Sequence, residues 1–508
     1  MLVKGTPGVR PPRARRVARD GSPRRLVGSG VIDSSALVIV ALLIAWPSFG
    51  WPLVSMDESV LLVYAEQVRS GGVPHRDFFT VYGPAPFYML ARLFSIFGSA
   101  LEVERALGLV LHIAIALGCY SLGRQRDRAT ALLAGSLSLI MLAPLGTVAY
   151  AWLGALACLV GAVSLAQRRQ RVGDFGAGLL AGLSACFRPE LIVVAVAVLA
   201  PHLWRSGRWR WTTAGFVAGL SPLAASALVA GPRMWQNIVP GRIGVNGSLR
   251  LTDNPGQSLA VLTSLICVTA ILVHYAWKRR SRVAVSHVLL ALGILPQALQ
   301  RMDTDHALYT LCITAPLVVV GAAAGPTTAD SIRRRRMLVV STIIAVMGSM
   351  SVMVLRPTHE TVRVTLSGRS AVIEAQDLPN LMDTRNALLA HAPSGGNVFI
   401  GSTDMSRAAL SRILVYYLLP ELRPRSYYLE LAAGISERAH SGLADDLRRA
   451  DVLLLTPMPE ELREQLFPYI TKGSDEANRV VASEFCPVNE TRWGTVYQHR
   501  PCAAPSLP

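Results

Sequence analysis

Apolar runs of about twenty residues recur along most of this 508-residue chain, from residue 31 to about residue 355. A helix of that length crosses the hydrocarbon core of a bilayer. Apolar residues make up 51% of the chain and charged residues only 16%. This composition overrides the several soluble domains that the length alone would suggest. The sequence therefore predicts a polytopic α-helical membrane protein with about eleven transmembrane helices.

Short clusters of basic residues follow alternate apolar runs, at 124–128, 168–171, 205–210, 278–282 and 333–336. Lys and Arg gather in cytoplasmic loops, so the clusters indicate orientation. They predict a protein of the cytoplasmic membrane with its N-terminus in the cytoplasm and its C-terminus outside. From Arg356 onward acidic residues slightly outnumber basic ones. The net charge of +17 therefore reports topology and does not indicate a nucleic-acid partner.

Composition divides the chain into three regions. Residues 1–30 form a basic cytoplasmic tail, 31–356 the transmembrane domain with its first outer loop at 54–100, and 357–508 a small extracytoplasmic α/β domain. In the last region we expect strands at 398–401, 452–455, 480–485 and 494–497, and helices over 377–392, 406–419 and 437–450.

The first outer loop carries charged groups on short ordered segments. The acid pair Asp57 and Glu58 opens a short helix, and a turn at 82–84 follows later. Ser55 and Glu58 match a capping box, in which the two side chains satisfy amide groups at a helix start. The box does not need Asp57. The acid pair can therefore be structural, as part of a helix start, or functional. The two interpretations can also coexist, with Glu58 holding the turn and Asp57 pointing into a cavity.

This loop resembles the first extracytoplasmic loop of the C-type (GT-C) glycosyltransferases, which are integral-membrane enzymes that use polyprenyl-phosphate sugars. The matching elements are the acid pair, the Gly-Gly-Val-Pro turn at 71–74, Asp-Phe-Phe at 77–79 and the Pro-aromatic segment at 84–88. The likeness is to the protein mannosyltransferase and aminoarabinose transferase group. It implies a GT-C-like fold, Asp57 as the catalytic base, a polyprenyl-phosphate sugar donor, and a glycan, glycolipid or protein as acceptor.

The sequence departs from this pattern at Gly83, where relatives often carry a basic residue that meets the donor phosphate. Another arginine must then take that role, and the outer loops offer Arg76, Arg188 and Arg301. A guanidinium group suits it because its planar fork meets two phosphate oxygens. The alternative for each arginine is a contact with lipid headgroups at the membrane interface.

A second charged turn, at 301–306, lies between two predicted spans. Charged groups there are costly unless they are solvated or paired, so the turn either closes on itself or lines a cavity. In the second interpretation Asp303 and His306 bind sugar hydroxyls. The full set of expected substrate-binding residues is Glu58, Arg76, Asp77, Tyr82, Arg188, Glu190, Arg301, Asp303 and His306.

The cofactor stays open at this stage. Asp57, Glu58, Asp303 and Asp305 offer oxygen ligands for a hard divalent cation, but nothing in the sequence fixes their geometry, so we assign no metal ligand.

Cys486 and Cys502 are expected to form a disulfide, because both lie in the region predicted to be exported. The other five cysteines lie within apolar runs.

The sequence leaves two functions that compete with glycosyl transfer. One is a transporter or flippase for a lipid-linked envelope precursor, although we find no internal repeat of the kind that many transporters show. The other is an envelope scaffold without catalytic activity.

Overall fold

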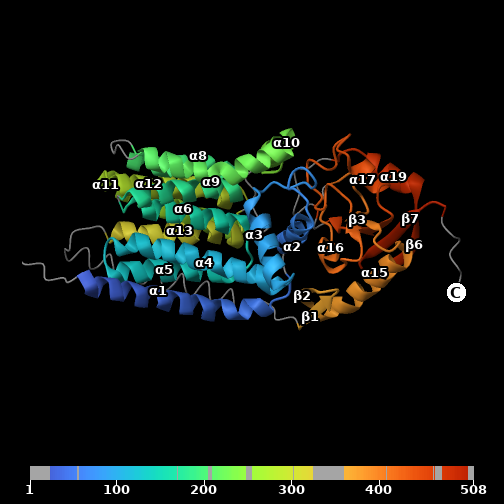
Figure 1. Ribbon diagram of the computed structural model, residues 1–508, viewed down its shortest axis with the longest axis horizontal. Helices are drawn as coiled ribbons and strands as arrows, with labels where there is room; N and C mark the ends of the chain where they lie inside the picture. The colour runs from blue at the N-terminus through green and yellow to red at the C-terminus, as the bar shows by residue number, and fades with distance from the viewer. Residues whose placement is uncertain are drawn as a thin grey trace, which may run out of the picture.

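The computed structural model describes residues 23–53, 56–168, 170–203, 209–246, 255–300, 302–323, 360–407, 409–460, 463 and 472–501. Its N-terminal two thirds form a bundle of long helices, and its C-terminal part forms a separate layer at one end of that bundle (Figure 1). The helices of the bundle are α1 (Pro23–Ala45), α4 (Leu101–Arg124), α5 (Arg128–Leu142), α6 (Ala151–Ala166), α7 (Arg171–Phe187), α8 (Ile192–Leu203), α9 (Trp209–Ala230), α11 (Pro255–Arg279), α12 (Arg282–Gln300) and α13 (Thr304–Ala322).

The described part of the chain contains 7 helices long and apolar enough to cross a membrane, and α6 and α8 are shorter apolar helices beside them. The predicted class, a multi-pass α-helical membrane protein, is confirmed. Each of the first ten predicted spans coincides with one of the bundle helices. The last predicted span, at 337–355, lies outside the described residues, so the count of eleven stays a prediction.

Helices α7 and α9 pack closely because both present glycines at a spacing of four. A Cβ atom at Gly178 would lie 2.0 Å from the Thr212 carbonyl oxygen, and one at Gly215 would lie 2.0 Å from the Phe175 carbonyl oxygen. Small residues let two backbones approach in a membrane, where burial of apolar surface contributes little to helix association.

Two helices lie between the bundle and the C-terminal layer (Figure 1). They are α2 (Met56–Arg69) and α3 (Ala85–Phe97), and both belong to the first outer loop. Further short elements at this end are η1 (Trp46–Gly50), η2 (Ala143–Leu145), η3 (Pro189–Leu191) and α10 (Pro232–Asn246).

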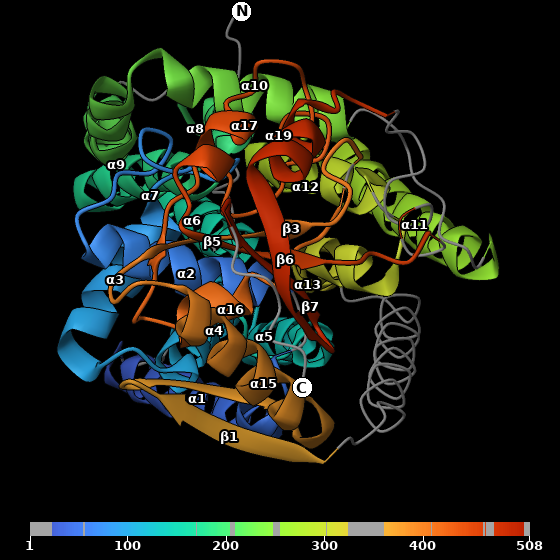
Figure 2. The ribbon, with the colours of Figure 1, turned by 90° about the vertical axis from the view of Figure 1, so that its right-hand side faces the viewer.

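The C-terminal part contains a hairpin and a mixed sheet. Strands β1 (Thr361–Leu366) and β2 (Arg369–Glu374) pair antiparallel, and η4 (Ala375–Asp377) and α15 (Leu378–His391) follow. The sheet has the order β4-β3-β5-β7-β6, and Figure 2 shows it from the side opposite the bundle. Its members are β3 (Asn397–Ser402), β4 (Arg423–Pro424), β5 (Val452–Thr456), β6 (Phe485–Thr491) and β7 (Gly494–His499), with α16 (Leu414–Leu418), α17 (Leu443–Arg448) and α19 (Glu476–Glu484) beside them.

Strands β3 and β5 are parallel and buried, as their continuous apolar runs predict. The expected strand at 480–485 is wrong, since 476–484 is helix α19. Its buried residues Ala477 and Val480 lie three apart, which is helical spacing. The expected helix at 406–419 forms only over α16. Before α16, the amide and hydroxyl of Ser406 both donate to the Asp404 carboxylate, and the Ser406 carbonyl oxygen accepts from the Gly473 amide. Ser406 therefore makes these hydrogen bonds outside a helix.

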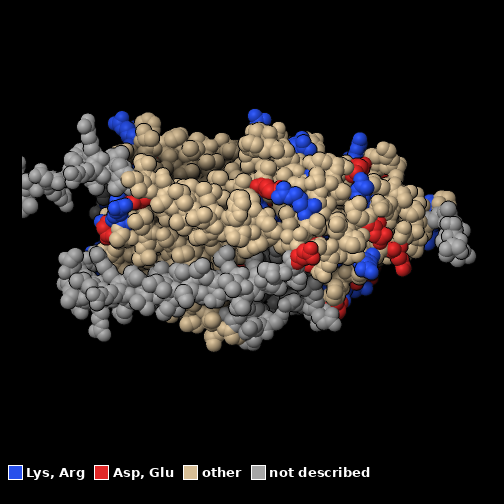
Figure 3. Space-filling view, turned by 90° about the horizontal axis from the view of Figure 1, so that it is seen from below, with Lys and Arg blue, Asp and Glu red and all other residues tan. Residues whose placement is uncertain are grey.

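The first outer loop and the C-terminal part lie at the same end of the molecule. Leu53 donates to the Val372 carbonyl oxygen at 2.8 Å, and Ala100 forms a bridge with Ser370. Helix α4 begins at this end, so its last residue, Arg124, lies at the other. Figure 3 shows a wide band of uncharged surface between charged groups at the two ends. This placement agrees with the relative sidedness that the basic clusters predict.

Candidate active site

Asp57 lies in the first turn of α2, where the helix dipole favours an acidic side chain. Tyr82, from the turn that precedes α3, donates from Oη to Asp57 Oδ1 at 3.4 Å. The Tyr82 ring also lies 5.6 Å from the Arg188 guanidinium. One tyrosine therefore connects the predicted base to one of the three predicted phosphate-binding arginines.

Arg188 follows the last residue of α7 and is buried. Its Nε donates to Glu190 Oε1 at 2.6 Å, and its Nη2 donates to Gln297 Oε1 of α12 at 3.1 Å. The guanidinium also lies 4.9 Å from the centre of the Trp152 ring of α6. Four segments thus fix one positive charge, and the structure brings Arg188, Glu190 and Tyr82 together as predicted site residues.

The start of α13 adds the second predicted turn to this cluster. Asp303 caps the helix by accepting from the His306 amide at 2.8 Å, and it also contacts His306 Nδ1 at 2.8 Å. The His306 ring lies against Tyr309. The indole of Trp152, which faces Arg188, donates to the Tyr309 carbonyl oxygen at 3.5 Å. The first turns of α13 therefore lie beside the Arg188 cluster. Arg301 lies outside the described residues.

Glu58 points away from this region into the protein. Arg105 of α4 donates to both of its carboxylate oxygens, at 2.8 Å and 3.2 Å, and both side chains are almost fully buried. The same guanidinium donates to the carbonyl oxygens of Ser48 and Trp51, at 2.8 Å each. These contacts give Glu58 a structural role as the partner of Arg105. The predicted capping box needs Ser55, which lies outside the described residues, so it stays a prediction. The predicted role of Glu58 in substrate binding also stays a prediction.

Arg76 and Asp77 form a pair of their own at the surface. Arg76 Nη2 lies 2.7 Å from Asp77 Oδ2, and both side chains are more than two fifths exposed. The hydrogen bond from Arg76 lowers the pKa of Asp77, and the same bond raises the pKa of Arg76. Asp77 also accepts from the Val73 amide at 2.8 Å, which closes the turn. A buried arginine is better placed than this pair to hold a phosphate group out of water.

The first outer loop also joins the C-terminal part at His75 and Phe79. Phe79 is buried among C-terminal residues, and its amide donates to the Tyr427 carbonyl oxygen at 2.7 Å. Tyr427 Oη donates to the His75 carbonyl oxygen at 2.9 Å and accepts from Asn237 of α10 at 2.7 Å. Burial lowers the pKa of the His75 imidazole to about 4, despite nearby backbone groups of Tyr82 and Thr80.

Solved structures of low sequence identity share this architecture. ArnT from Cupriavidus metallidurans, bound to undecaprenyl phosphate, matches with a TM-score of 0.56 and 12% identity over 93% of this chain and 99% of ArnT. The apo structure of ArnT matches with a TM-score of 0.53, at 14% identity over 93% and 98% of the two chains. The oligosaccharyltransferase from Archaeoglobus fulgidus, in complex with Zn and sulfate, has a TM-score of 0.51 and 13% identity over 91% of this chain and 73% of its own. No family model matches the sequence, and no curated protein matches it either.

The chain has the C-type glycosyltransferase fold. The fold resemblance expected from the first outer loop is thereby confirmed. The departure at Gly83 has a physical reason in this version of the fold. The Gly83 amide donates to the Phe187 carbonyl oxygen at 3.0 Å, and a Cβ atom here would lie 2.2 Å from the Cys186 carbonyl oxygen. The backbone itself fills the place of a basic side chain and brings the turn against Arg188.

The archaeal structure of this fold contains Zn. We identify no comparable set of metal ligands among the described residues of this chain. No group of three or more His, Cys, Asp or Glu side chains gathers there in a way that would hold a metal ion. We therefore derive no chemical step through a metal.

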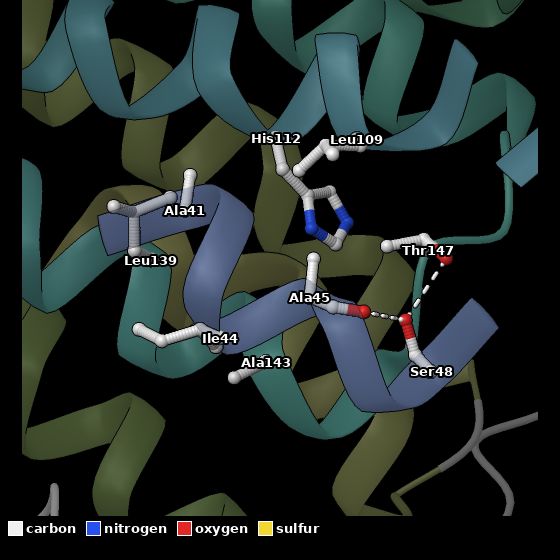
Figure 4. Close-up of a pocket in the computed structure, with 10 residues that line it drawn as sticks. Ala41, Ile44, Ala45, Ser48, Leu109, His112, Leu139, Ala143 and Thr147 are labelled. Carbon is white, nitrogen blue, oxygen red and sulfur yellow. Dashed lines mark hydrogen bonds between the residues drawn. The ribbon is translucent and has the colours of Figure 1, made fainter. Parts of the chain in front are cut away.

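A small pocket lies between α1, α4 and α5 (Figure 4), outside the cluster of Asp57 and Arg188. The His112 ring points into it, and Ser48 Oγ lies 3.0 Å from Thr147 Oγ1 at its edge. Leu109 and Leu139 are among its apolar walls. None of the predicted substrate-binding residues lines this pocket.

Cys486 is disulfide-bonded, and the other described cysteines are free. The predicted partner, Cys502, lies outside the described residues, so the pairing stays a prediction.

Sequence reasoning missed Trp152, Gln297, Tyr309 and Arg105. Trp152 and Tyr309 lie in apolar runs, where an aromatic residue that faces a site has the same pattern as one that faces lipid. Gln297 could have been recognised as a site residue, because a lone amide side chain in an apolar span needs a hydrogen-bond partner.

Proposed function

We propose that this protein is an inverting glycosyltransferase that moves a sugar from a polyprenyl-phosphate donor to a cell-envelope acceptor. The reaction takes place at the outer face of the cytoplasmic membrane, with the N-terminus in the cytoplasm and the C-terminal part outside. The shared fold supports transfer from a lipid-linked donor, because ArnT of this fold binds undecaprenyl phosphate. The sugar, whether hexose or pentose, and the acceptor are left open.

The observation that carries the proposal is the contact of Asp57 with Tyr82 and of Tyr82 with Arg188. A carboxylate and a guanidinium from segments far apart in the sequence contact one phenol group, the first at its hydroxyl and the second over its ring. Inverting transfer needs this combination, since a base must accept a proton on one side of the sugar and a cation must face the phosphate on the other. Burial strengthens the attraction of Arg188 for a phosphate.

The proposed step is a single displacement. The acceptor hydroxyl gives its proton to Asp57, and its oxygen attacks the anomeric carbon of the sugar. The bond between that carbon and the phosphate oxygen breaks, and the polyprenyl phosphate leaves with the electron pair. Arg188 offsets its negative charge, while Glu190 and Gln297 keep the guanidinium in place. A positioned general base typically contributes about 10²- to 10⁴-fold to such a rate.

Asp303 and His306 serve the sugar in this proposal. Asp303 accepts the hydrogen of His306 Nδ1 and so fixes the imidazole at the start of α13. In this proposal His306 Nε2 meets a sugar hydroxyl beside Tyr309. Asp303 acts mainly through this orientation, because its carboxylate also caps the helix.

Mass spectrometry of envelope glycans and lipid-linked sugars tests the function in cells with and without the gene. We expect deletion to remove one sugar from an envelope glycan and to increase the lipid-linked form of that sugar. Wild-type protein should restore both levels, and Asp57→Asn should restore neither. Unchanged glycans and lipid-linked sugars on deletion would contradict the proposal. Movement of a lipid-linked sugar across proteoliposomes with its phosphate bond intact would favour a flippase.

A further inference from the structure

Helix α2 is attached to the C-terminal part through the buried side chain of Glu66. The Glu66 carboxylate is 3% exposed and lies 2.8 Å from Arg369 Nη2 of β2 and 2.9 Å from Arg69 Nη2. The Ser99 hydroxyl donates to its other oxygen. A buried carboxylate held by two arginines and a hydroxyl is fixed much more firmly than a surface ion pair.

Arg369 connects this carboxylate to α16. Its Nη1 donates to the carbonyl oxygens of Tyr417 and Tyr416, at 2.8 Å and 3.4 Å. The guanidinium also lies 5.6 Å from the Tyr417 ring. One side chain thus holds the hairpin, α16 and α2 together, and it is only 15% exposed.

The other end of α2 is attached to the membrane bundle. Glu58 is paired with Arg105, which in turn bonds to the carbonyl oxygens that follow α1. Asp57 lies beside this second attachment, nine residues before Glu66. A helix rises about 1.5 Å per residue, so the two attachments, at Glu58 and Glu66, are about 12 Å apart on one rigid element. The C-terminal part, through Glu66, therefore acts on the same rigid helix that carries Asp57.

We propose that Arg369 is a positioning residue, through which the C-terminal part sets the place of Asp57 relative to Arg188. The structural part of this inference needs only the two ion pairs, and its effect on rate rests on the proposed function. A helix end displaced by 1 Å from a reacting group can cost about 10²-fold in rate. The C-terminal part then takes part in catalysis without touching the reacting atoms.

Hydrogen exchange of the full-length protein in nanodiscs tests the attachment without any substrate. Arg369→Gln removes the guanidinium and its charge and leaves a shorter polar side chain. We expect amide exchange in α2, including its first turn at 56–60, to increase about tenfold or more. The matched control is Arg363→Gln on the neighbouring strand. Arg363 is 60% exposed in its pair with Glu102, and its loss should leave α2 unchanged. Equal exchange in α2 for both variants would overturn the inference.

Turnover separates a positioning role from a stabilising one. With the lipid-linked sugar that accumulates in the deletion strain, Arg369→Gln should lower kcat by about 10- to 100-fold and change KM by about twofold or less. Arg369→Lys should recover part of the rate, because it keeps a charge for Glu66. A lower melting temperature with kcat unchanged per folded molecule would overturn the role. If Arg369→Gln does not fold, Glu66→Gln carries the same test. Inactive wild-type protein would instead count against the proposed function, while the exchange result would still stand.

Discussion

Arg188 and Arg76 are the two predicted phosphate-binding arginines that the structure describes, and their surroundings differ. The Arg188 guanidinium is buried and oriented by Glu190, Gln297 and Trp152. The guanidinium of Arg76 instead forms an ion pair with Asp77 at the surface. Interactions between charged groups weaken in contact with water, so the buried Arg188 attracts a phosphate group more strongly than the exposed Arg76 does.

We expect Arg188→Gln to weaken binding of undecaprenyl phosphate about 10- to 100-fold, the loss of one charge-assisted hydrogen bond or two. Arg448→Gln, which removes an exposed pair on α17, is the matched control and should bind normally. Binding is measured in nanodiscs with labelled undecaprenyl phosphate. Normal binding by Arg188→Gln would move the phosphate to another arginine.

At the scale of elements, the turn from His75 to Gly83 sets the place of Tyr82. His75 has a positive φ of 66° and a buried ring at the junction with Tyr427. Gly83 packs against the end of α7 without room for a side chain. These two contacts fix the ends of the segment that carries Tyr82 to Arg188.

Gly83→Ala should destabilise the protein by about 1–3 kcal/mol, because the Cys186 carbonyl oxygen belongs to the backbone and cannot turn aside. Gly50→Ala is the control, since a Cβ atom there meets nothing within 4 Å. Thermal unfolding in detergent measures both. Equal melting temperatures would show that the turn does not rest on α7 as described.

His75 predicts a pH dependence of stability. Its folded pKa of about 4 lies below the ordinary value of 6.5, because burial disfavours the charged ring. The unfolded chain therefore binds the proton first, and stability falls as the pH drops from about 6.5 toward 4. His75→Asn accepts a positive φ and carries no titrating group. Its melting temperature should fall less than that of the wild type between pH 7 and pH 5. Identical slopes would contradict the account.

At the scale of the whole molecule, the bundle was predictable and the site was only partly so. The lengths of the apolar runs and the positions of the basic clusters located the helices, because both are local features of the sequence. The α7–α9 packing and the contact of Tyr82 with Arg188 depend on segments that only folding brings together. Residues 480–485 show that local sequence can also mislead, because a short apolar run such as Val-Val-Ala fits a strand and a helix equally well. The hairpin at 361–374 was missed, and it carries Arg369.

Topology predicts which end faces the outside. In a background where the native free cysteines are replaced by serine, Gln376→Cys should react with an impermeant maleimide in intact cells. Arg280→Cys should react only after the cells are opened. Both positions are exposed, so accessibility alone does not separate them. Labelling of Arg280→Cys in intact cells would reverse the orientation.

The most direct test of the account is turnover by Asp57→Asn beside its neighbour Glu58→Gln. Purified proteins in nanodiscs are given the lipid-linked sugar from the deletion strain with its glycan acceptor, and release of the lipid phosphate is measured. Asp57→Asn keeps the contact with Tyr82 but cannot accept the proton. We predict that its rate falls about 100-fold or more while binding of undecaprenyl phosphate changes about twofold or less. Glu58→Gln still accepts from Arg105, so its loss should appear mainly in stability. If Asp57→Asn turns over at nearly the wild-type rate, Asp57 is not the base, and the mechanism proposed for this site is wrong.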